Sequence, residues 1–318
     1  MKLQQLRCLT EVARRGLNVS EAAEALHTSQ PGVSKQIRAL EDELGIQVFV
    51  RHGKRLVEVT EPGKAVISIA ERILAEAQNL RRAGEEFAND QLGTLTIAAT
   101  HTQARYALPK AVAAFKRKYP KVELVLHQGN PTQICEQVLS GEADMGVATE
   151  AISDYPELVS LPVYQWNRCV VVQPKHPLLK AKPLTLERLA EYLIVTYDFA
   201  FANRSLVQKA FETRGLKPHV VLAAQDADVI KTYVELGLGV GILAKMAFDP
   251  KRDTTLRAID ASHLFESSTT RLGIKRGAYL RRYAYDFIEL FAPQLARTTV
   301  ERAVRSSGSE PELPEAGL

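Results

Sequence analysis

The 318-residue chain has little cysteine, no long apolar run and no large excess of charge of either sign. Its three cysteines, Cys8, Cys135 and Cys169, lie far apart and form no Cys-x-x-Cys motif, which argues against a disulfide framework and a zinc ribbon. No apolar run reaches the roughly 18 residues that a membrane span needs. Arg7 and Glu11 interrupt the N-terminal segment, which therefore lacks the apolar core of a signal peptide. We expect a reduced, cytoplasmic protein with no membrane partner.

The composition is that of a folded protein. Hydrophobic residues make up 46% of the chain and charged residues 25%, which excludes a chain that is disordered as a whole. The length predicts about two domains. A formal net charge of +4 permits nucleic acid as a partner but does not identify one.

Hydrophobic patterning divides the chain into four parts. Residues 1–60 contain short helical patterns, residues 61–88 form one long helical pattern, and residues 89–300 alternate strand-like and helix-like runs. Residues 301–318 are rich in Pro, Ser, Glu and Gly and offer little to bury, so we expect a disordered tail there.

The alternating region predicts an α/β domain. Strand-like runs cover 94–99, 122–127 and 143–148, and a helical run over 131–140 lies between the second and the third. This order is typical of parallel βαβ units. Later strands are predicted at 168–172, 220–223, 240–243 and 271–274, and a last helix at 279–291. Ligands of open α/β sheets bind beyond the carboxyl ends of the strands, so we expect a site there.

The N-terminal 60 residues predict a helix-turn-helix. Leu3, Leu6 and Leu9 repeat at helical spacing, and Ser20 is placed to cap a second helix. Pro31 suits the first turn of a third helix, whose core-facing stripe is Val33, Ile37, Leu40 and Leu44. The opposite side presents Gln30, Ser34, Lys35 and Arg38. Two helices joined this tightly can place the second one in the major groove of DNA.

The exposed side of that third helix has DNA-reading chemistry. Gln30, Ser34 and Arg38 can exchange hydrogen bonds with base edges, and Lys35 can neutralise a phosphate. The basic turn at 51–55, between two short strand-like runs, predicts a wing that touches the DNA backbone or minor groove. The alternative is a small helical module that binds nothing. Residues 1–60 hold nine basic and seven acidic side chains, so bulk charge does not decide between the two.

The segment from Ala22 to Gly45, AAEALHTSQPGVSKQIRALEDELG, resembles the head motif of the LysR-type transcriptional regulators nearly position for position. Residues 49–51 and 60–63 are similar to the wing and the linker start of that family. The rest of the chain resembles its CysB branch, the regulators of cysteine biosynthesis and sulfate assimilation. The matching segments are 100–106, 127–133, 147–150, 166–168, 226–233 and 237–241. The resemblance covers about residues 1–300.

This resemblance implies a winged helix-turn-helix, a linker helix and a two-lobe α/β effector domain similar to periplasmic binding proteins. Lobe I would comprise about 92–162 and 269–300, and lobe II 163–268. The resemblance further implies binding to double-stranded promoter DNA, assembly as a dimer of dimers, and RNA polymerase as a candidate partner. The DNA-binding residues would be Ser29, Gln30, Pro31, Ser34, Lys35, Arg38, Arg51, Lys54 and Arg55.

Residues 61–88 carry a heptad-like seam. Its members, at alternating spacings of four and three, are Val66, Ala70, Ile73, Ala77, Leu80, Gly84 and Phe87. At 1.5 Å per residue this helix would be roughly 40 Å long, which is more than one small head can bury. We therefore favour a dimer seam that presents two heads to two DNA half-sites. The alternative is a helix packed on its own chain.

Polar residues follow the predicted strands of the α/β region. Thr100, Thr102 and Gln103 lie just past the first strand, where a loop enters a helix and free backbone N–H groups favour an anion. Thr149 follows the third strand and can converge on the same crevice. Hydroxyls and an amide suit sulfate or a carboxylate. The plainer interpretation is that each threonine caps a helix or forms a turn.

The family resemblance implies an effector and no cofactor or metal. Sulfate, thiosulfate, N-acetylserine or O-acetylserine would bind to Thr100, Thr102, Gln103 and Thr149. Trp166 lies near the same cleft by resemblance, or it packs in the core. The loop 197–205 departs from the branch, because Ala202 stands where the branch usually offers a threonine. That change removes a donor, for which Asn203 is a candidate substitute; otherwise the ligand is bound more weakly or is a different one.

Two other functions fit parts of the sequence. A small-molecule-binding protein of another pathway would need only residues 92–300, and its effector would differ because of Ala202, but the DNA-reading head argues against a pure binding or uptake protein. An enzyme would need paired carboxylates, a metal-ligand cluster or a nucleophile triad. Cys135 and His127 have no acid partner in the pattern. We therefore predict a regulator and not an enzyme.

Overall fold

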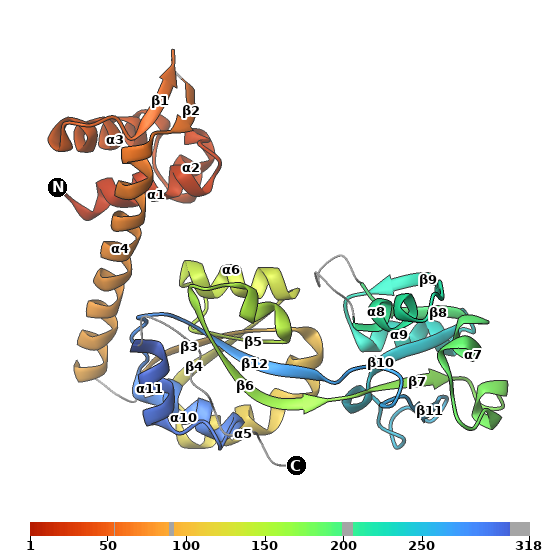
Figure 1. Cartoon of the computed structure of the whole chain (residues 1–318). Coiled ribbons are helices and arrows are strands. Elements are labelled where there is room, and N and C mark those ends of the chain that lie inside the picture. The colour runs from red at the N-terminus through yellow and green to blue at the C-terminus, as the bar shows by residue number, and fades with distance from the viewer. Residues whose placement is uncertain (54, 89–91, 199–205, 306–318) are drawn as a thin grey trace. The chain divides into compact units, whose positions relative to one another are not determined.

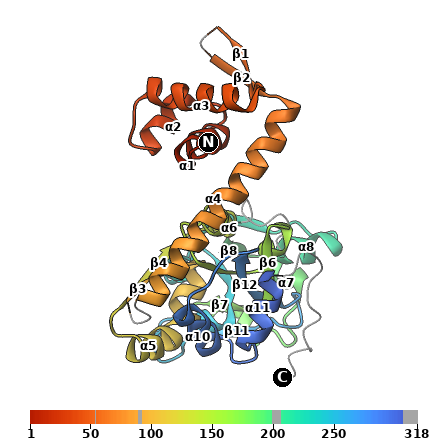
Figure 2. The same ribbon diagram turned by 90° about the vertical axis from the view of Figure 1, so that its left-hand side faces the viewer.

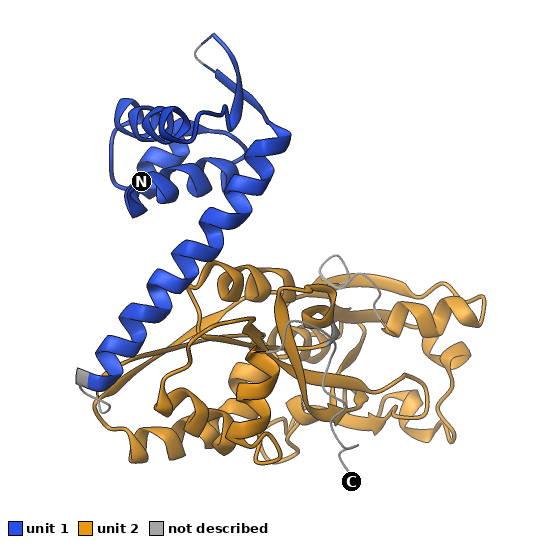
Figure 3. Cartoon of the chain, turned by 60° about the vertical axis from the view of Figure 1, so that its left-hand side comes forward, with its two compact units in different colours: residues 1–88 blue, residues 89–318 orange. Residues whose placement is uncertain are grey.

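The computed structural model describes residues 1–53, 55–88, 92–198 and 206–305. The chain forms two compact units, Met1–Ala88 and Asn89–Leu318 (Figure 3). Within the described ranges, no helix is long and apolar enough to cross a membrane.

The first unit is a three-helix head with a two-stranded wing and a long helix. Its elements are α1 (Leu3–Arg14), α2 (Val19–Ala25), α3 (Gln30–Leu44), β1 (Phe49–His52), β2 (Arg55–Val59) and α4 (Glu61–Ala88) (Figure 1). The strands β1 and β2 are antiparallel, and Gly53 between them has a φ of 64°, a conformation that suits glycine. The winged helix-turn-helix therefore forms where the sequence predicts it.

Local side-chain chemistry sets the ends of α2 and α3. Asn18 caps α2, because its side-chain oxygen accepts hydrogen bonds from the backbone N–H groups of Ser20 and Glu21. The predicted cap at Ser20 is wrong: the helix already begins at Val19, and asparagine caps as well as serine does. Ser29 caps α3 through the N–H of Gly32.

The head core is built on the predicted stripe of α3, with one exception. Val33, Ile37 and Leu40 are buried together with Leu9 of α1. Leu44 is 41% exposed, so its predicted place in the core is wrong. It is the last residue of α3, one turn after the buried Leu40.

The long helix α4 is used differently along its length. Ala70 is buried in the head core, and Val66 and Ile73 pack against that core. Leu80 is 75% exposed and Phe87 is 90% exposed. The first half of the predicted seam therefore faces its own head, as the alternative interpretation holds, and the second half presents unpaired apolar side chains within this unit.

The second unit has two lobes. Lobe I contains β3 (Gly93–Ala99), α5 (Leu108–Lys118), β4 (Val122–Gln128), α6 (Pro131–Ser140), β5 (Met145–Ala148), β6 (Leu158–Trp166), β12 (Ser268–Lys275), α10 (Arg282–Phe291) and α11 (Arg297–Arg305). Lobe II contains β7 (Arg168–Val172), α7 (Leu186–Ala190), β8 (Leu193–Tyr197), α8 (Leu206–Thr213), β9 (His219–Ala224), α9 (Ala227–Glu235), β10 (Val240–Ala244) and β11 (Arg257–Asp260). A π-helical turn, Gln103–Ala107, leads into α5.

Each lobe is built on a five-stranded mixed sheet. The strand order is β4-β3-β5-β12-β6 in lobe I and β11-β7-β10-β8-β9 in lobe II. β3 is parallel to β4 and β5, and β8 is parallel to β9 and β10, as expected for βαβ units. β12 and β7, which follow the two crossings between the lobes, run antiparallel to their neighbours.

Helices cover both faces of each sheet. In lobe I, α5 and α10 pack on one face through Phe115 and Phe287, and α6 packs on the other through Ile134 (Figure 2). In lobe II, α8 covers one face through Phe211 and α9 the other through Ile230. Each sheet thus lies between two apolar cores, which leaves the ends of its strands as the place for a site.

Two predicted boundaries are corrected by the structure. β6 extends to Trp166, so lobe I continues past the predicted end at 162 and resumes at 268. Pro162, which lacks an N–H group, hides this strand in the sequence; β6 tolerates it because β6 is an edge strand that carries a bulge at Val163, next to the proline. The predicted tail also begins too early, because α11 runs to Arg305 and buries Val304.

Candidate effector cavity and nucleic-acid interface

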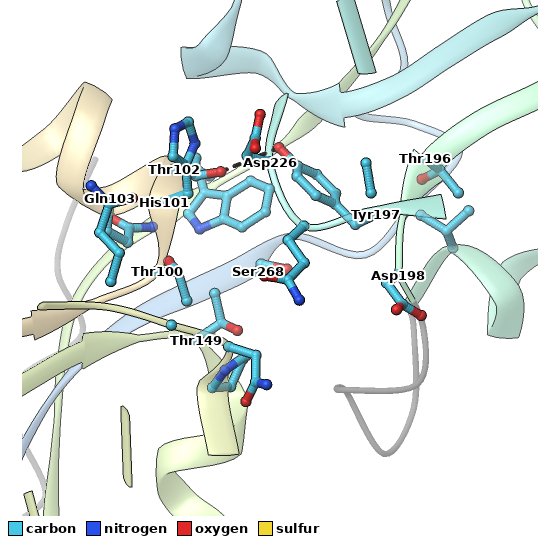
Figure 4. Close-up of a pocket in the computed structure, with 18 of the residues that line it drawn as sticks. Thr100, His101, Thr102, Gln103, Thr149, Thr196, Tyr197, Asp198, Asp226 and Ser268 are labelled. Carbon is cyan, nitrogen blue, oxygen red and sulfur yellow. Dashed lines mark hydrogen bonds between the residues drawn. The ribbon is translucent and has the colours of Figure 1, made fainter. Parts of the chain in front are cut away.

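A cavity of about 330 Å³ is lined by residues of both lobes (Figure 4). Much of its lining lies at or just past the carboxyl ends of β3, β4 and β5 in lobe I and of β8 and β9 in lobe II. This is the position that open α/β sheets use for ligands.

Thr100 and Thr149 enter the cavity from neighbouring strands. β3 and β5 are parallel, so both residues leave the sheet at the same edge. The backbone N–H of Thr100 donates to the carbonyl of Val147 at 3.2 Å, which ties the two strand ends together. Both threonines line the cavity, as their positions after strands predict.

Thr102 joins the two lobes. Its hydroxyl lies 3.4 Å from the hydroxyl of Tyr197, as the dashed line in Figure 4 marks. The same tyrosine oxygen accepts a hydrogen bond from the backbone N–H of Ala244 at 3.3 Å. Burial raises the pKa of Tyr197, so its phenol stays protonated near neutral pH and can donate.

Gln103 is held by its own lobe. Its side chain is 1% exposed. The amide nitrogen donates to the hydroxyl of Thr270 at 3.0 Å, and the amide oxygen accepts from the hydroxyl of Tyr164. Both ends of the amide are thus engaged at the cavity wall, and direct ligand binding by Gln103 stays a prediction.

The crossing from β6 to β7 supplies Trp166 and Arg168 to the cavity. The Trp166 indole nitrogen is buried, and among the described residues it has no hydrogen-bond acceptor. The Arg168 guanidinium lies 5.0 Å from the centre of the Trp166 ring and donates to the Ser268 hydroxyl at 2.8 Å. Arg168 is only 9% exposed, so bulk water screens its charge little.

Arg168 and Ser268 are not among the predicted site residues. They come together because β6 and β12 pair in lobe I, with Trp166 opposite Ser268. The first crossing between the lobes therefore begins where the second one ends. No local pattern reveals that pairing. The signal that could have found Arg168 is its position two residues after Trp166 in a segment that resembles the family.

Lobe II adds two carboxylates that the sequence patterns do not reveal. Asp198 follows β8, Asp226 precedes α9, and both line the cavity (Figure 4). Asp226 also caps α9 by accepting from the N–H of Val229 at 2.8 Å. The cavity therefore combines hydroxyls and a guanidinium with carboxylates, so it suits a ligand that carries both an anionic group and hydrogen-bond donors.

His101, Asp226 and Asp228 each bring one potential metal-ligand atom within 4.8 Å of the others. Asp228, however, is already paired with the Arg105 guanidinium at 2.6 Å and with the Lys231 ammonium at 3.1 Å. Two cations this close oppose a third positive charge. The group is therefore an ion-pair network rather than a good metal site.

Three predicted site residues, Lys54, Ala202 and Asn203, lie outside the described residues. The effect of Ala202 on the ligand stays a prediction.

The buried cysteines are not poised for catalysis. Burial raises the pKa of Cys135 and of Cys169 to about 12. Since the thiolate is the nucleophilic form, both thiols stay in the weakly nucleophilic protonated form near neutral pH.

The predicted DNA-reading residues lie on one accessible side of α3 in the first unit. Gln30, Lys35 and Arg38 are exposed, and Ser34 is half-buried. Pro31 is exposed in the first turn, where it needs no hydrogen-bond donor. Ser29, in contrast, uses its hydroxyl to cap the helix.

The wing contributes two arginines in different situations. Arg55 is exposed at the start of β2. Arg51 on β1 donates instead to the buried carboxylate of Glu41 at 2.7 Å, and Glu41 also accepts from the backbone N–H of Val48 at 2.9 Å. Arg51 thus fastens the wing to α3, and its contact with DNA stays a prediction.

Comparisons with known proteins match both units. The family model described as "Bacterial regulatory helix-turn-helix protein, lysR family" matches residues 3–64, and the "LysR substrate binding domain" model matches residues 88–296. The transcriptional regulator CysB of Burkholderia cenocepacia is 55% identical over 98% of this chain and 100% of its own length. The regulator cbl of Escherichia coli is 47% identical over 98% of each chain.

Solved structures agree with these matches. The cofactor-binding domain of the Cbl transcriptional regulator is 43% identical with a TM-score of 0.66, covering 69% of this chain and 96% of that one. A structure of full-length CbnR in complex with its target DNA has a TM-score of 0.55 at 21% identity, covering 92% of this chain and 99% of that one. This second likeness shows the fold alone.

Proposed function

This chain belongs to the LysR family of bacterial DNA-binding transcriptional regulators, and we propose that it controls genes of sulfur assimilation and cysteine biosynthesis in response to a small anionic effector. The pathway rests on its similarity to CysB and cbl. The effector class rests on one observation: Thr100, Thr149 and the little-exposed Arg168 line the same cavity. The relatives are named as transcriptional regulators, and the chain is not an enzyme.

The cavity favours an acetylserine over a simple oxyanion. Sulfate and thiosulfate can accept hydrogen bonds from hydroxyls and from Arg168, but they offer no donor to Asp198 or Asp226. N-acetylserine carries a carboxylate together with an amide N–H and a hydroxyl, and O-acetylserine carries a carboxylate together with an ammonium. Both can satisfy the donors and the acceptors of the cavity at once.

Calorimetric titration of the full chain with these four compounds tests the effector. We expect saturable binding that weakens about tenfold or more in Thr100→Ala, because a hydrogen bond to a charged ligand is lost. The matched control is Thr94→Ala, at the start of the same strand and exposed, which should bind as the wild type does. Asp198→Asn should weaken O-acetylserine more than sulfate.

Absence of binding to all four compounds would overturn the sulfur-pathway assignment. It would favour the second candidate, a regulator of another pathway with a different effector, to which the Ala202 departure points. The family assignment does not depend on this result.

For DNA we propose that α3 enters the major groove, with Gln30, Ser34 and Arg38 toward base edges and Lys35 toward phosphate. Ser29 and Pro31 would lie at the helix start against the backbone, and the wing residues Arg51, Lys54 and Arg55 would flank the groove. The exposed row on α3 supports this placement.

Fluorescence anisotropy with a promoter fragment tests the DNA contacts. Arg38→Ala should weaken specific binding by about 10- to 100-fold, whereas Lys35→Ala should weaken all sequences alike and reduce the salt slope by about one. Arg14→Ala is the control, because Arg14 is exposed on α1 and pairs with Glu71. Unchanged specific binding in Arg38→Ala would remove this residue from base reading.

Assembly completes the proposal. A dimer of dimers would place paired heads on paired half-sites, and RNA polymerase is the partner that activation at a promoter requires. Such a regulator works in the cytoplasm, where promoter DNA is.

A further inference from the structure

A turn of lobe I is fastened to a helix of lobe II beside the effector cavity. The π-helical turn Gln103–Ala107 comes directly after Thr100 and Thr102. It directs Arg105 and Tyr106 to Asp228 in the first turn of α9. The Arg105 guanidinium lies 2.6 Å from one Asp228 oxygen, and the Tyr106 hydroxyl donates to the other at 2.7 Å.

The lobe II side of this contact is firmly anchored. Lys231, one turn after Asp228 on α9, is 8% exposed. Its ammonium lies 3.1 Å from Asp228 and 2.9 Å from Asp253, and it donates to the Tyr106 hydroxyl at 3.2 Å. Two cations, Arg105 and Lys231, thus face the carboxylates of Asp228 and Asp253 in this half-buried network.

Apolar packing strengthens the same contact. The Tyr106 ring, which belongs to lobe I, packs against the lobe II core cluster that contains Ile230 and Leu243. The Lys231 ammonium lies 5.6 Å from the centre of this ring. An aromatic side chain of lobe I therefore packs against the core of lobe II.

None of Arg105, Tyr106, Asp228 and Lys231 is among the residues that line the effector cavity. The network nevertheless joins the segment that carries Thr100 and Thr102 to the helix capped by Asp226, which does line it. Apart from the contact with His101, which lines the cavity and lies 3.9 Å from Asp228, these four residues can act on the ligand only through the arrangement of the lobes.

We propose that Asp228 is a positioning residue for the effector: it clamps the Gln103–Ala107 turn of lobe I to α9 of lobe II and so holds the two lobes closed around the bound anion. This inference rests on the proposed function of the cavity. Ligand and clamp favour the same closed arrangement, so weakening the clamp lowers the population of the binding-competent state and with it the apparent affinity.

The clamp predicts a specific kinetic effect in the full-length protein. Asp228→Asn keeps the shape of the side chain but removes its charge, and Tyr106→Phe removes one hydroxyl. With the four-compound panel above, both variants should release the ligand faster, and affinity should fall about tenfold or more in Asp228→Asn. Asp228→Glu, which keeps the charge, should recover part of this loss. The control is Asp260→Asn, whose carboxylate pairs with Lys245 at 2.8 Å within lobe II.

A double-mutant cycle separates the clamp from a general loss of stability. If Tyr106 and Asp228 act as a pair, the double variant should lose less affinity than the sum of the two single losses. The melting temperature, measured for each variant beside its titration, should stay close to that of the wild type, whereas the release rate should rise. Unchanged release in both single variants would overturn the clamp, and so would additive losses.

Hydrogen exchange without ligand separates failure of the clamp from failure of the proposed effector. In Asp228→Asn the amides of 103–107 and of the first turn of α9 should exchange faster than in the wild type, and in Asp260→Asn they should not. If the wild type binds none of the four compounds, the proposed effector fails, and this exchange pattern still decides the clamp. Unchanged exchange at both segments would overturn it.

Discussion

Arg51 on the wing donates to Glu41 of α3 at 2.7 Å, and the Glu41 side chain is almost completely buried. The other oxygen of this carboxylate is also engaged, because the backbone N–H groups of Val48 and Phe49 both donate to it. A buried carboxylate left without its cation is costly. Stability of the head therefore constrains a residue that the family resemblance assigns to DNA.

We expect Arg51→Ala to lower the free energy of unfolding of the head by about 1–3 kcal/mol, because it removes a charge-assisted hydrogen bond to a buried group. Thermal denaturation followed by circular dichroism measures this loss. Arg15→Ala, which breaks the more exposed pair with Glu11 on α1, should change the melting temperature little. If Arg51→Ala melts like the wild type and only DNA affinity falls, Arg51 is a DNA contact and not a brace.

Gln103 and Thr100 should respond differently to truncation. Gln103→Ala leaves the hydroxyls of Thr270 and Tyr164 without their amide partner inside lobe I, so we expect it to lower the melting temperature of the second unit. Thr100→Ala should weaken effector binding and leave the melting temperature nearly unchanged. Differential scanning calorimetry beside the titration checks both. A strong loss of affinity in Gln103→Ala with no change in melting would make Gln103 a direct ligand.

The exposed half of the α4 seam predicts an oligomer contact. Leu80→Glu combined with Phe87→Glu should shift the full chain to a smaller species in sedimentation velocity, because charges replace the apolar groups of a helix–helix seam. Gln78→Glu adds a charge to an exposed position of the same helix and serves as the control. An unchanged sedimentation coefficient in the double variant would exclude this part of α4 from the seam.

The sequence predicts the parts of this fold that depend on neighbouring residues. The stripe from Val33 to Leu40 and the short strands before Thr100 and Thr149 are local patterns, and the structure contains the corresponding elements. The common direction of β3, β4 and β5 follows from two successive βαβ units. Local patterns are therefore sufficient to place these two threonines at one cavity.

The remaining site residues depend on pairings between distant segments. Arg168 lies just after the first crossing between the lobes. Its hydrogen-bond partner Ser268, a hundred residues further along the chain, lies just after the second crossing. Pro162 conceals the strand that leads to the first crossing. Tyr106 of lobe I and Asp228 of lobe II are 122 residues apart in the sequence, so no local periodicity or motif predicts their contact. In α4, the same four-three spacing places Ala70 in the head core and Leu80 at an exposed position. Only the packing of α1 against α4 distinguishes these two parts of the helix.

Asp286 on α10 predicts an acid-sensitive stability of the second unit. Burial acts to raise the pKa of Asp286, but the Lys118 ammonium at 2.6 Å and the Tyr119 hydroxyl outweigh it and hold the pKa below its usual range. Because the pKa is lower in the folded state, Asp286 contributes stability above the unfolded value of about 3.9, and this contribution is lost as pH falls through the folded pKa.

In urea unfolding between pH 7 and pH 2.5, we expect Asp286→Asn to be less stable than the wild type near neutral pH. The difference should shrink below about pH 4, as the wild type loses the contribution of its carboxylate. Lys118→Met keeps the carboxylate but removes the cation, so its stability should fall less steeply with acid than that of the wild type. A difference between wild type and Asp286→Asn that stays constant over this range would mean that Asp286 stabilises α10 by packing and hydrogen bonding alone, because a group with equal pKa in both states adds no pH dependence.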